Sequence, residues 1–211
     1  MANRGKQNIM QLQTHPDKTR EADLEIVDGR RQRSERSRAA IITATLNLLE
    51  DGDFAPTAKK IAEEAGVGLR SFFRHFEDMD ALFEAVDQHI RHHYETLFDR
   101  PYRDDCLETR IADIVTDRSE AYERLKKMML STQAQLWRSQ TLQKNYARNQ
   151  KNLRNHLEKW VPELKAVPTA NRESVHAAAS FEMWHRLRHH QKLNITDARA
   201  SVIAMLTGLI V

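Results

Sequence analysis

The sequence predicts an all-α protein, with a small helix-turn-helix unit near the N-terminus and a larger helical region after it. Three observations support this fold class. Only six glycines and five prolines occur among 211 residues, which leaves little material for the turns between strands. Apolar residues recur every three or four positions, as on one side of a helix, and runs of alternating apolar residues are few. The length is sufficient for a small head and a larger body.

The first segment, residues 1–33, mixes polar and charged residues with few large apolar ones, so we expect a flexible leader. Basic residues gather at its end, because residues 30–38 contain five arginines, among them Arg36 and Arg38, and one acid, Glu35. Such a basic segment either contacts nucleic acid or is a solvated tail with no fixed role. The sequence leaves both readings open.

The next two helices are expected to begin the helix-turn-helix unit. The first of them, Ser34–Glu50, has a continuous apolar side and ends before Gly52. Thr57 is expected to cap the second, Ala58–Ala65, by accepting a hydrogen bond from a first-turn amide. Gly66 suits the left-handed conformation that ends a helix. These residues therefore predict a tight turn between the second helix and a third one.

The third helix, residues 69–76 after Gly68, is predicted to have one apolar and one polar side. One stripe, at the spacing i, i+3, i+4 and i+7, contains Leu69, Phe72, Phe73 and Phe76. We expect this stripe to be buried, so that its aromatic residues hold the short helix rigid. The opposite side contains Arg70, Ser71, Arg74 and His75. With Lys59 and Lys60 in solvent nearby, this side is typical of a probe for a nucleic-acid groove.

Many motif positions of this unit occur together at a consistent spacing. They are Ile41-Ile42-Thr43-Ala44, Leu48-Leu49-Glu50-Asp51-Gly52, Phe54-Ala55-Pro56-Thr57, Ile61-Ala62-Glu63-Glu64-Ala65-Gly66-Val67, Phe72-Phe73-Arg74-His75-Phe76 and Ala81-Leu82. These segments resemble the DNA-binding head of the tetracycline-repressor (TetR) family of bacterial transcription regulators. The resemblance implies an all-helical, two-fold symmetric dimer whose remaining helices form a divergent domain for effector binding and dimerisation.

The resemblance also assigns roles to single positions. Phe73 lies where the family usually has a tyrosine that touches phosphate, Gly68 replaces the usual capping serine, and Met79 stands where many members have a lysine. Each departure removes a hydrogen bond or a charge at the DNA backbone. Arg70 lies where a glycine is common, which suggests an added base or phosphate contact. The expected DNA-binding residues are Arg36, Arg38, Thr57, Lys59, Lys60, Gly68, Arg70, Ser71, Phe73, Arg74 and His75.

The rest of the chain is predicted to be helical as well. Asp78 is expected to cap a long helix through Phe98 that breaks at Pro101. Further helices are expected at 105–116, 118–136, 139–160, 169–191 and 196–210. Thr169 and Thr196 are the expected N-caps of the last two, which by the resemblance would pair with their copies in the dimer. The apolar seam of that interface is predicted to contain Val202, Ile203, Leu206, Leu209 and Ile210.

Two groups of residues in this second region suggest binding sites. A pocket between helices should be apolar and aromatic with a few polar groups. Its candidates are Met128, Met129, Gln133, Trp137, Trp160, Met183 and Trp184. Ordinary packing explains any single one of them better. His185 and His189, four residues apart, could both reach one metal ion, but neither a zincin pattern nor a cysteine accompanies them. A solvated face is the better explanation, so we expect no metal and no cofactor.

Composition excludes several other classes. The single cysteine, Cys106, excludes an intramolecular disulfide and a cysteine-pair metal site. No segment approaches the roughly 20 apolar residues that a membrane span needs, and the polar N-terminus lacks the apolar core of a secretory signal. A cytoplasmic location is therefore expected. A glycine-rich phosphate loop and a Gly-x-Ser-x-Gly motif are both absent from the sequence, so nothing supports catalysis.

The sequence thus predicts a basic leader over residues 1–33, a helix-turn-helix DNA-binding domain over 34–79, and a domain for effector binding and dimerisation over 80–211. The protein is expected to be a ligand-responsive regulator of transcription that acts as a homodimer on a pseudo-palindromic operator. Repression is the mode of regulation that we expect. Its partners would be double-stranded DNA, an unknown small-molecule effector and a second copy of itself, with no membrane partner. The alternative is a ligand-binding or interaction protein whose degenerate head binds DNA weakly.

Overall fold

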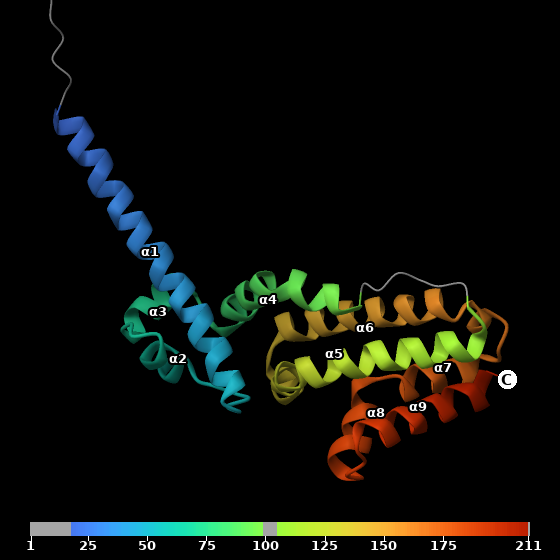
Figure 1. The fold of residues 1–211 in the computed structure, drawn as a ribbon. Coiled ribbons are helices and arrows are strands. Elements are labelled where there is room, and N and C mark those ends of the chain that lie inside the picture. The colour runs from blue at the N-terminus through green and yellow to red at the C-terminus, as the bar shows by residue number, and fades with distance from the viewer. Residues whose placement is uncertain (1–17, 99–104, 211) are drawn as a thin grey trace, which may run out of the picture.

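The computed structural model describes residues 18–98 and 105–210, and every regular element in these two ranges is helical (Figure 1). A head of three helices joins an elongated body through α4. The head contains α1 (Lys18–Glu50), α2 (Ala58–Glu64) and α3 (Leu69–His75). The connecting helix and the body contain α4 (Met79–Glu95), η1 (Thr96–Phe98), α5 (Leu107–Gln135), η2 (Leu136–Arg138), α6 (Gln140–Trp160), η3 (Pro162–Lys165), α7 (Thr169–Ala178), α8 (Phe181–His185), η4 (Arg186–His190) and α9 (Ile195–Ile210). The all-α prediction is confirmed.

The head has its own apolar core, to which all four neighbouring helices contribute. Ile41 of α1, Ile61 of α2, Phe72 of α3 and Leu82 of α4 are fully buried together. Burial of these side chains stabilises helices that are too short to persist alone. The core therefore fixes α3 against the other two helices of the head.

The expected turn chemistry of the head is present. Thr57 caps α2, because its hydroxyl accepts a hydrogen bond from the Lys60 amide at 3.3 Å. Gly66 has a φ of +65°, which is the left-handed conformation that favours glycine. Asp78 caps α4 by accepting from the Ala81 amide at 2.8 Å. These predictions are confirmed.

The first helix is longer than predicted, since α1 begins at Lys18 rather than at Ser34. The segment between these residues contains no proline and is rich in residues with good helix propensity, so its polarity alone does not end the helix. In Figure 1 the N-terminal part of α1 extends away from the head. The remainder of the expected leader and the expected break at Pro101 lie outside the described residues.

A single helix, α5, replaces the two helices expected at 105–116 and 118–136. The expected boundary falls at Asp117 and Arg118, and both of these charged side chains are buried. The Arg118 guanidinium donates hydrogen bonds to the carbonyl oxygens of Ala179, at 3.0 Å, and Leu153. Because these acceptors come from distant segments, the sequence pattern could not reveal that the charged pair belongs to the interior.

The helix predicted at 169–191 is interrupted instead of continuous. Ser180 begins a new helix, α8, by accepting a hydrogen bond from the Met183 amide at 3.2 Å. The carbonyl of Ala179, just before this break, accepts hydrogen bonds from Arg118 and from the Tyr122 hydroxyl. The break therefore supplies the backbone acceptor that two buried polar side chains of α5 require.

The two N-caps predicted for the last helices are wrong. Pro168 precedes α7, and Thr169 is the first residue of that helix. Asn194 caps α9, because its side-chain oxygen accepts from the Asp197 amide at 2.9 Å, and Thr196 lies within the first turn. Asparagine is as good an N-cap as threonine or better, so the sequence rule alone does not decide between Asn194 and Thr196.

Part of the predicted dimer seam faces the interior of the protomer itself. Val202 and Leu206 of α9 are buried in the core of the body, where α9 packs against α5 and α7. The other three predicted residues, Ile203, Leu209 and Ile210, are partly buried and pack against the same core. Val202 and Leu206 are therefore unable to supply an interface with a second copy, because one helix side cannot cover both surfaces.

Candidate nucleic-acid interface and interior cavity

The apolar stripe predicted on α3 is narrower than expected. Phe72 and Phe76 are 0% and 2% exposed, whereas Leu69 and Phe73 are 43% and 48% exposed. The Phe73 ring meets the Phe72 ring edge to face, with centroids 5.2 Å apart, and does not enter the core. The prediction that Phe73 is buried and holds the helix rigid is therefore wrong. The small core of the head accommodates only Phe72 and Phe76, which point directly into it.

Two arginines extend from the exposed side of α3. Arg70 and Arg74 are both exposed, and Arg74 donates a hydrogen bond to the Ser71 hydroxyl at 3.0 Å. Within the part of the chain that the structure describes, neither guanidinium forms an ion pair with a carboxylate. Their charge is thus available to an external anion, and a guanidinium suits both phosphate oxygens and the edge of guanine.

His75 and Arg38 lie at the margin of this surface. Burial lowers the pKa of His75, and the nearby charges of Arg74 and Arg38 lower it further. His75 is half-buried, and its Nε2 atom is buried without a hydrogen bond to any described residue. The Arg38 guanidinium lies over the Phe76 ring, 5.1 Å from its centroid, and so links α1 to the end of α3. Arg36 is exposed two residues nearer the N-terminus.

On α2, which lies beside α3, one of the two predicted DNA-contacting lysines is already paired with a carboxylate. Lys60 forms an ion pair with Asp53 at 2.7 Å, and the hydrogen bond from Lys60 lowers the pKa of that carboxyl. Lys59 is 3.9 Å from Glu63, with both side chains well exposed, so this contact is weak. Of the two lysines predicted to meet the DNA backbone, Lys59 is therefore the more available. Gly68 caps α3 without a side chain.

The body contains a cavity of about 500 Å³ beside α4. Its walls come from α4, η1, α5 and α6, and they combine methionine and aromatic side chains with amides and hydroxyls. The lining residues are His92, Tyr94, Glu95, Thr96, Phe98, Leu125, Met128, Met129, Thr132, Gln133, Tyr146, Asn149, Gln150, Asn152, Leu153 and His156. A space of this size and composition is typical of a small-molecule site.

The cavity contains Met128, Met129 and Gln133 of the predicted pocket, but not the other four candidates. Trp160 and Trp184 belong to the core of the body, and the Trp184 indole donates to Glu123 at 3.0 Å. Met183 lines a separate surface hollow. Trp137 is 80% exposed in η2, beyond the end of α5. Apolar composition predicts burial, but it does not separate a cavity wall from a packed core.

The predicted histidine group forms a stack on the surface of the body. The rings of His185 and His189 are 4.9 Å apart and nearly parallel. In residues 18–98 and 105–210, no three His, Cys, Asp or Glu side chains come together as a metal-binding group. The same two ranges contain no helix with the length and apolar character of a bilayer span.

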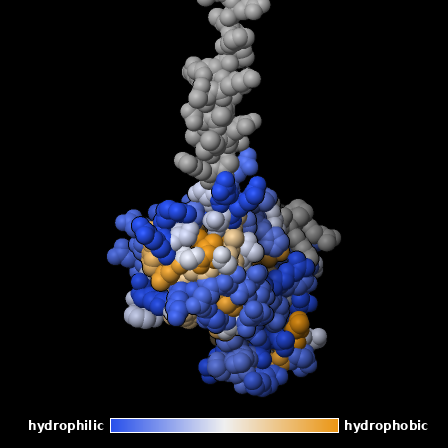
Figure 2. Space-filling model, turned by 90° about the vertical axis from the view of Figure 1, so that its left-hand side faces the viewer, coloured by the Kyte–Doolittle hydropathy of each residue, from blue (hydrophilic) through white to orange (hydrophobic). Residues whose placement is uncertain are grey.

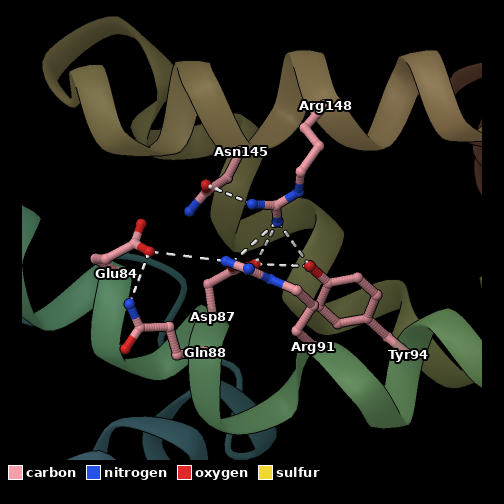
Figure 3. A network of polar contacts seen from close by, with 7 residues as sticks. All are labelled: Glu84, Asp87, Gln88, Arg91, Tyr94, Asn145 and Arg148. Atoms are coloured by element: carbon pink, nitrogen blue, oxygen red, sulfur yellow. Dashed lines mark hydrogen bonds and ion pairs between the residues drawn. The ribbon is translucent and has the colours of Figure 1, made fainter.

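A polar network joins α4 to α6 next to the cavity (Figure 3). At its centre, the Asp87 carboxylate accepts hydrogen bonds from the Tyr94 hydroxyl at 2.6 Å and from Arg148 at 2.9 and 3.0 Å. Arg91 donates to the same carboxylate through Nε at 3.0 Å. Arg148 also donates to Tyr94 at 2.9 Å and to Asn145 at 3.0 Å. One carboxylate therefore connects two arginines and a tyrosine that also lines the cavity.

The electrostatics of this network favour the ionised carboxylate. Burial alone would raise the pKa of Asp87, but the hydrogen bonds from Tyr94, Arg91 and Arg148 outweigh it and hold the pKa below its ordinary value. Burial and the neighbouring carboxylate raise the pKa of Tyr94 to about 12. The sequence alone does not single out these residues. Asp87 and Arg91 read as an ordinary surface pair at i, i+4, and only the fold adds Arg148.

Further hydrogen bonds attach the head to the body. Ser131 and Gln135 of α5 donate to the Phe54 carbonyl at 2.9 and 3.0 Å. Ser139, which caps α6, donates to Asp80 of α4 at 2.5 Å. The position of α3 is thus linked to the helices that surround the cavity.

An exposed pair of arginines on a short anchored helix, within a helix-turn-helix and joined to an all-helical body, is an arrangement suited to binding DNA. A family model described as bacterial regulatory proteins, tetR family, matches residues 41–86, which include α2 and α3. The head of this chain is thus similar to that of bacterial regulatory proteins of the tetR family.

Two solved structures resemble most of the fold. One, described as a transcriptional regulator of Streptomyces coelicolor A3(2), is 22% identical, with a TM-score of 0.58, and the match covers 83% of this chain and 98% of that one. The other, a transcriptional regulator of Rhodococcus sp. Rha1, is 14% identical, with a TM-score of 0.60, and the match covers 84% and 95%. At these identities the likeness concerns the fold. A search of curated protein sequences gives no significant match.

Proposed function

We propose that the protein is a ligand-responsive repressor that binds a pseudo-palindromic operator as a homodimer. The observation that carries this proposal is the exposed, unpaired charge of Arg70 and Arg74 on a helix held from behind by buried Phe72. Two copies of α3, related by a two-fold axis, would enter successive major grooves. Arg70 and Arg74 would reach base edges, while Lys59 and Thr57 would contact the DNA backbone.

The proposed dimer would use the side of α9 opposite its buried stripe. Ala204 and Gly208 are exposed there, four residues apart, and their small size permits close approach of a second helix. Ile203 and Ile210 lie between this side and the core and retain partial exposure. The proposal is supported by the two-fold symmetry that operator binding by helix-turn-helix proteins commonly requires.

The proposed response to a ligand uses the cavity and the network beside it. An effector that contacts Tyr94 in the cavity would compete with its hydrogen bond to Asp87. Because Asp87 and Asp80 both lie on α4, a change there would move the helix that carries the head. DNA release would follow from an altered spacing between the two recognition helices.

DNA binding is tested by enrichment of duplexes from a random library, followed by footprinting and a salt titration. We expect an enriched sequence with two-fold symmetry, protection of two half-sites about one helical turn apart, and an affinity that falls steeply with salt. Arg74→Ala should weaken binding to that duplex by roughly 1 to 3 kcal/mol without unfolding the protein. Arg186→Ala, which removes the same charge from an exposed position in the body, is the matched control and should bind like the wild type.

The second candidate function is a ligand-binding or interaction protein with weak DNA affinity. It is favoured by the lost contacts at the DNA backbone, since Phe73 has no hydroxyl, Gly68 has no capping side chain, and Lys60 is paired with Asp53. Micromolar binding that is equal for all sequences would support this candidate against the repressor.

The ligand response is tested with a small-molecule library, scored by both melting temperature and DNA affinity. A true effector should raise the melting temperature and weaken operator binding. Both effects should disappear in Leu153→Trp, which fills the cavity, and remain in Lys151→Trp, on the exposed side of the same helix. Effects that persist in Leu153→Trp would place the ligand elsewhere.

A further inference from the structure

Two apolar side chains stand on the exposed surface of the recognition helix. Leu69 and Phe73 are four residues apart, so they lie one turn apart on the same side of α3, and both keep over two fifths of their surface in solvent. Figure 2 views the side of the molecule where α2 and α3 lie, and it shows hydrophobic residues surrounded by hydrophilic ones. Arg70 and Arg74 are the next residues around the helix.

Packing of the head does not require this apolar pair. Phe72 and Phe76 already fill the core beneath α3, and Phe73 touches only the edge of Phe72. A smaller side chain at position 73 would leave the core closed. The exposed half of the Phe73 ring therefore calls for an explanation outside the head, and the flanking arginines indicate that the partner is a polyanion.

We propose that Phe73 contacts the C5-methyl group of a thymine in the operator, with Leu69 beside it. This inference rests on the proposed DNA-binding function and names the feature of the DNA that this part of α3 reads. In the major groove a base pair presents hydrogen-bond donors and acceptors, and thymine adds an apolar methyl group. A phenyl ring offers no hydrogen bond to the donors and acceptors, but it can bury the methyl group.

A contact between Phe73 and phosphate is unfavourable for the same reason. The ring would remove water from charged oxygens and replace it with nothing that can donate a hydrogen bond. Arg70 and Arg74, by contrast, can pair with phosphate or with guanine from the adjacent positions of the helix. The two residue types on α3 would thus contact different parts of the half-site. Phe73 would face an A·T pair, and an arginine would face phosphate or a G·C pair.

The test removes single methyl groups from the DNA and leaves the protein unchanged. Duplexes enriched from the random library are resynthesised with deoxyuridine in place of thymine, one position at a time, and their dissociation constants are measured for the full-length wild type. Loss of one buried methyl contact should weaken binding about fourfold, which corresponds to about 0.8 kcal/mol. We expect this loss at one or two thymines of each half-site and no change at the others.

Variants assign the effect to its side chain. In Phe73→Ala the sensitive thymine should tolerate deoxyuridine with less than a twofold change, whereas Phe73→Leu should retain part of the sensitivity. Lys59→Ala is the control, because it should bind all duplexes more weakly but keep the full fourfold response. A melting curve for each variant separates loss of contact from loss of folding.

The outcomes separate the two proposals. If no sequence is enriched, the proposed function and this inference both fail. If a symmetric operator is enriched but every thymine tolerates deoxyuridine, or its half-sites contain no thymine, the regulator stands and the inference is overturned. The same conclusion follows if Phe73→Ala keeps the methyl response of the wild type.

Discussion

The carboxylate of Asp87 is the position where one substitution tests the connection between head and body. Asp87→Asn keeps the shape of the side chain but removes the charge that accepts hydrogen bonds from Tyr94, Arg91 and Arg148. The Asp87 side chain is 12% exposed, and breaking a buried ion pair costs about 3 to 5 kcal/mol. Both arginines are about one third exposed and can regain water, so we expect a smaller loss of about 2 to 3 kcal/mol.

Urea denaturation at pH 7 measures this loss of unfolding free energy, and a loss of this size lowers the melting temperature by about 4 to 12 °C. Glu35→Gln provides the matched control, because Glu35 pairs with Arg31 in a solvated i, i+4 contact. That change should cost at most about 0.5 kcal/mol. Tyr94→Phe should cost about 1 to 2 kcal/mol, since it removes the hydrogen bonds of the hydroxyl with Asp87 and Arg148 and keeps the ring. Equal stabilities of Asp87→Asn and Glu35→Gln would refute the reasoning.

The effect of Asp87→Asn also has a defined pH dependence. The pKa of Asp87 is lower in the folded protein than its ordinary value of 3.8, so its contribution to stability is complete above pH 3.8. The contribution is lost as pH falls through the depressed pKa and the carboxylate is protonated. The stability difference between wild type and variant should therefore be constant from pH 7 to about 5 and shrink below 3.8. A difference that shrinks already near neutral pH would point to another group.

Two further predictions concern the head, and calorimetry or chemical denaturation checks both. Phe72→Ala should destabilise the head by about 3 to 5 kcal/mol, because the Phe72 ring is fully buried. Phe73→Ala should cost only about 1 kcal/mol, because about half of the Phe73 side chain is exposed. Equal losses would contradict the exposure of Phe73. Gly68→Ser should raise the stability of the head by a few tenths of a kcal/mol, since a Cβ at this position meets no other atom and the serine hydroxyl can cap α3. Gly66→Ala should lower the stability by about 1 kcal/mol or more, because residue 66 has a positive φ.

The sequence predicted those parts of the fold that depend on neighbouring residues. Caps and turns act over three or four positions, so Thr57, Gly66 and Asp78 could be assigned from the order of residues alone. The core positions Ile61 and Phe72 followed from helical periodicity for the same reason.

The errors in the body and on α3 arise because the surroundings of a residue are set by segments that are distant in the sequence. The burial of Arg118 within a continuous α5 depends on the Ala179 carbonyl, which lies 61 positions away. Phe73 looked like core because a helical stripe does not reveal how wide the facing core is. The network around Asp87 escaped notice because Arg148 comes from another helix.

These long-range contacts limit how strongly an effector could control the head. A ligand shifts an arrangement only by the free energy of the contacts that differ between the two states. Several hydrogen bonds described above join the head and α4 to α5 and α6. Among them, the network around Asp87 is the one that includes a residue of the cavity wall, Tyr94. If an effector breaks this network, its stabilisation of about 2 to 3 kcal/mol caps the change in operator affinity at about 30-fold to 150-fold. Asp87→Asn, which breaks the network in advance, should then lower operator affinity without any effector and leave little further response to one.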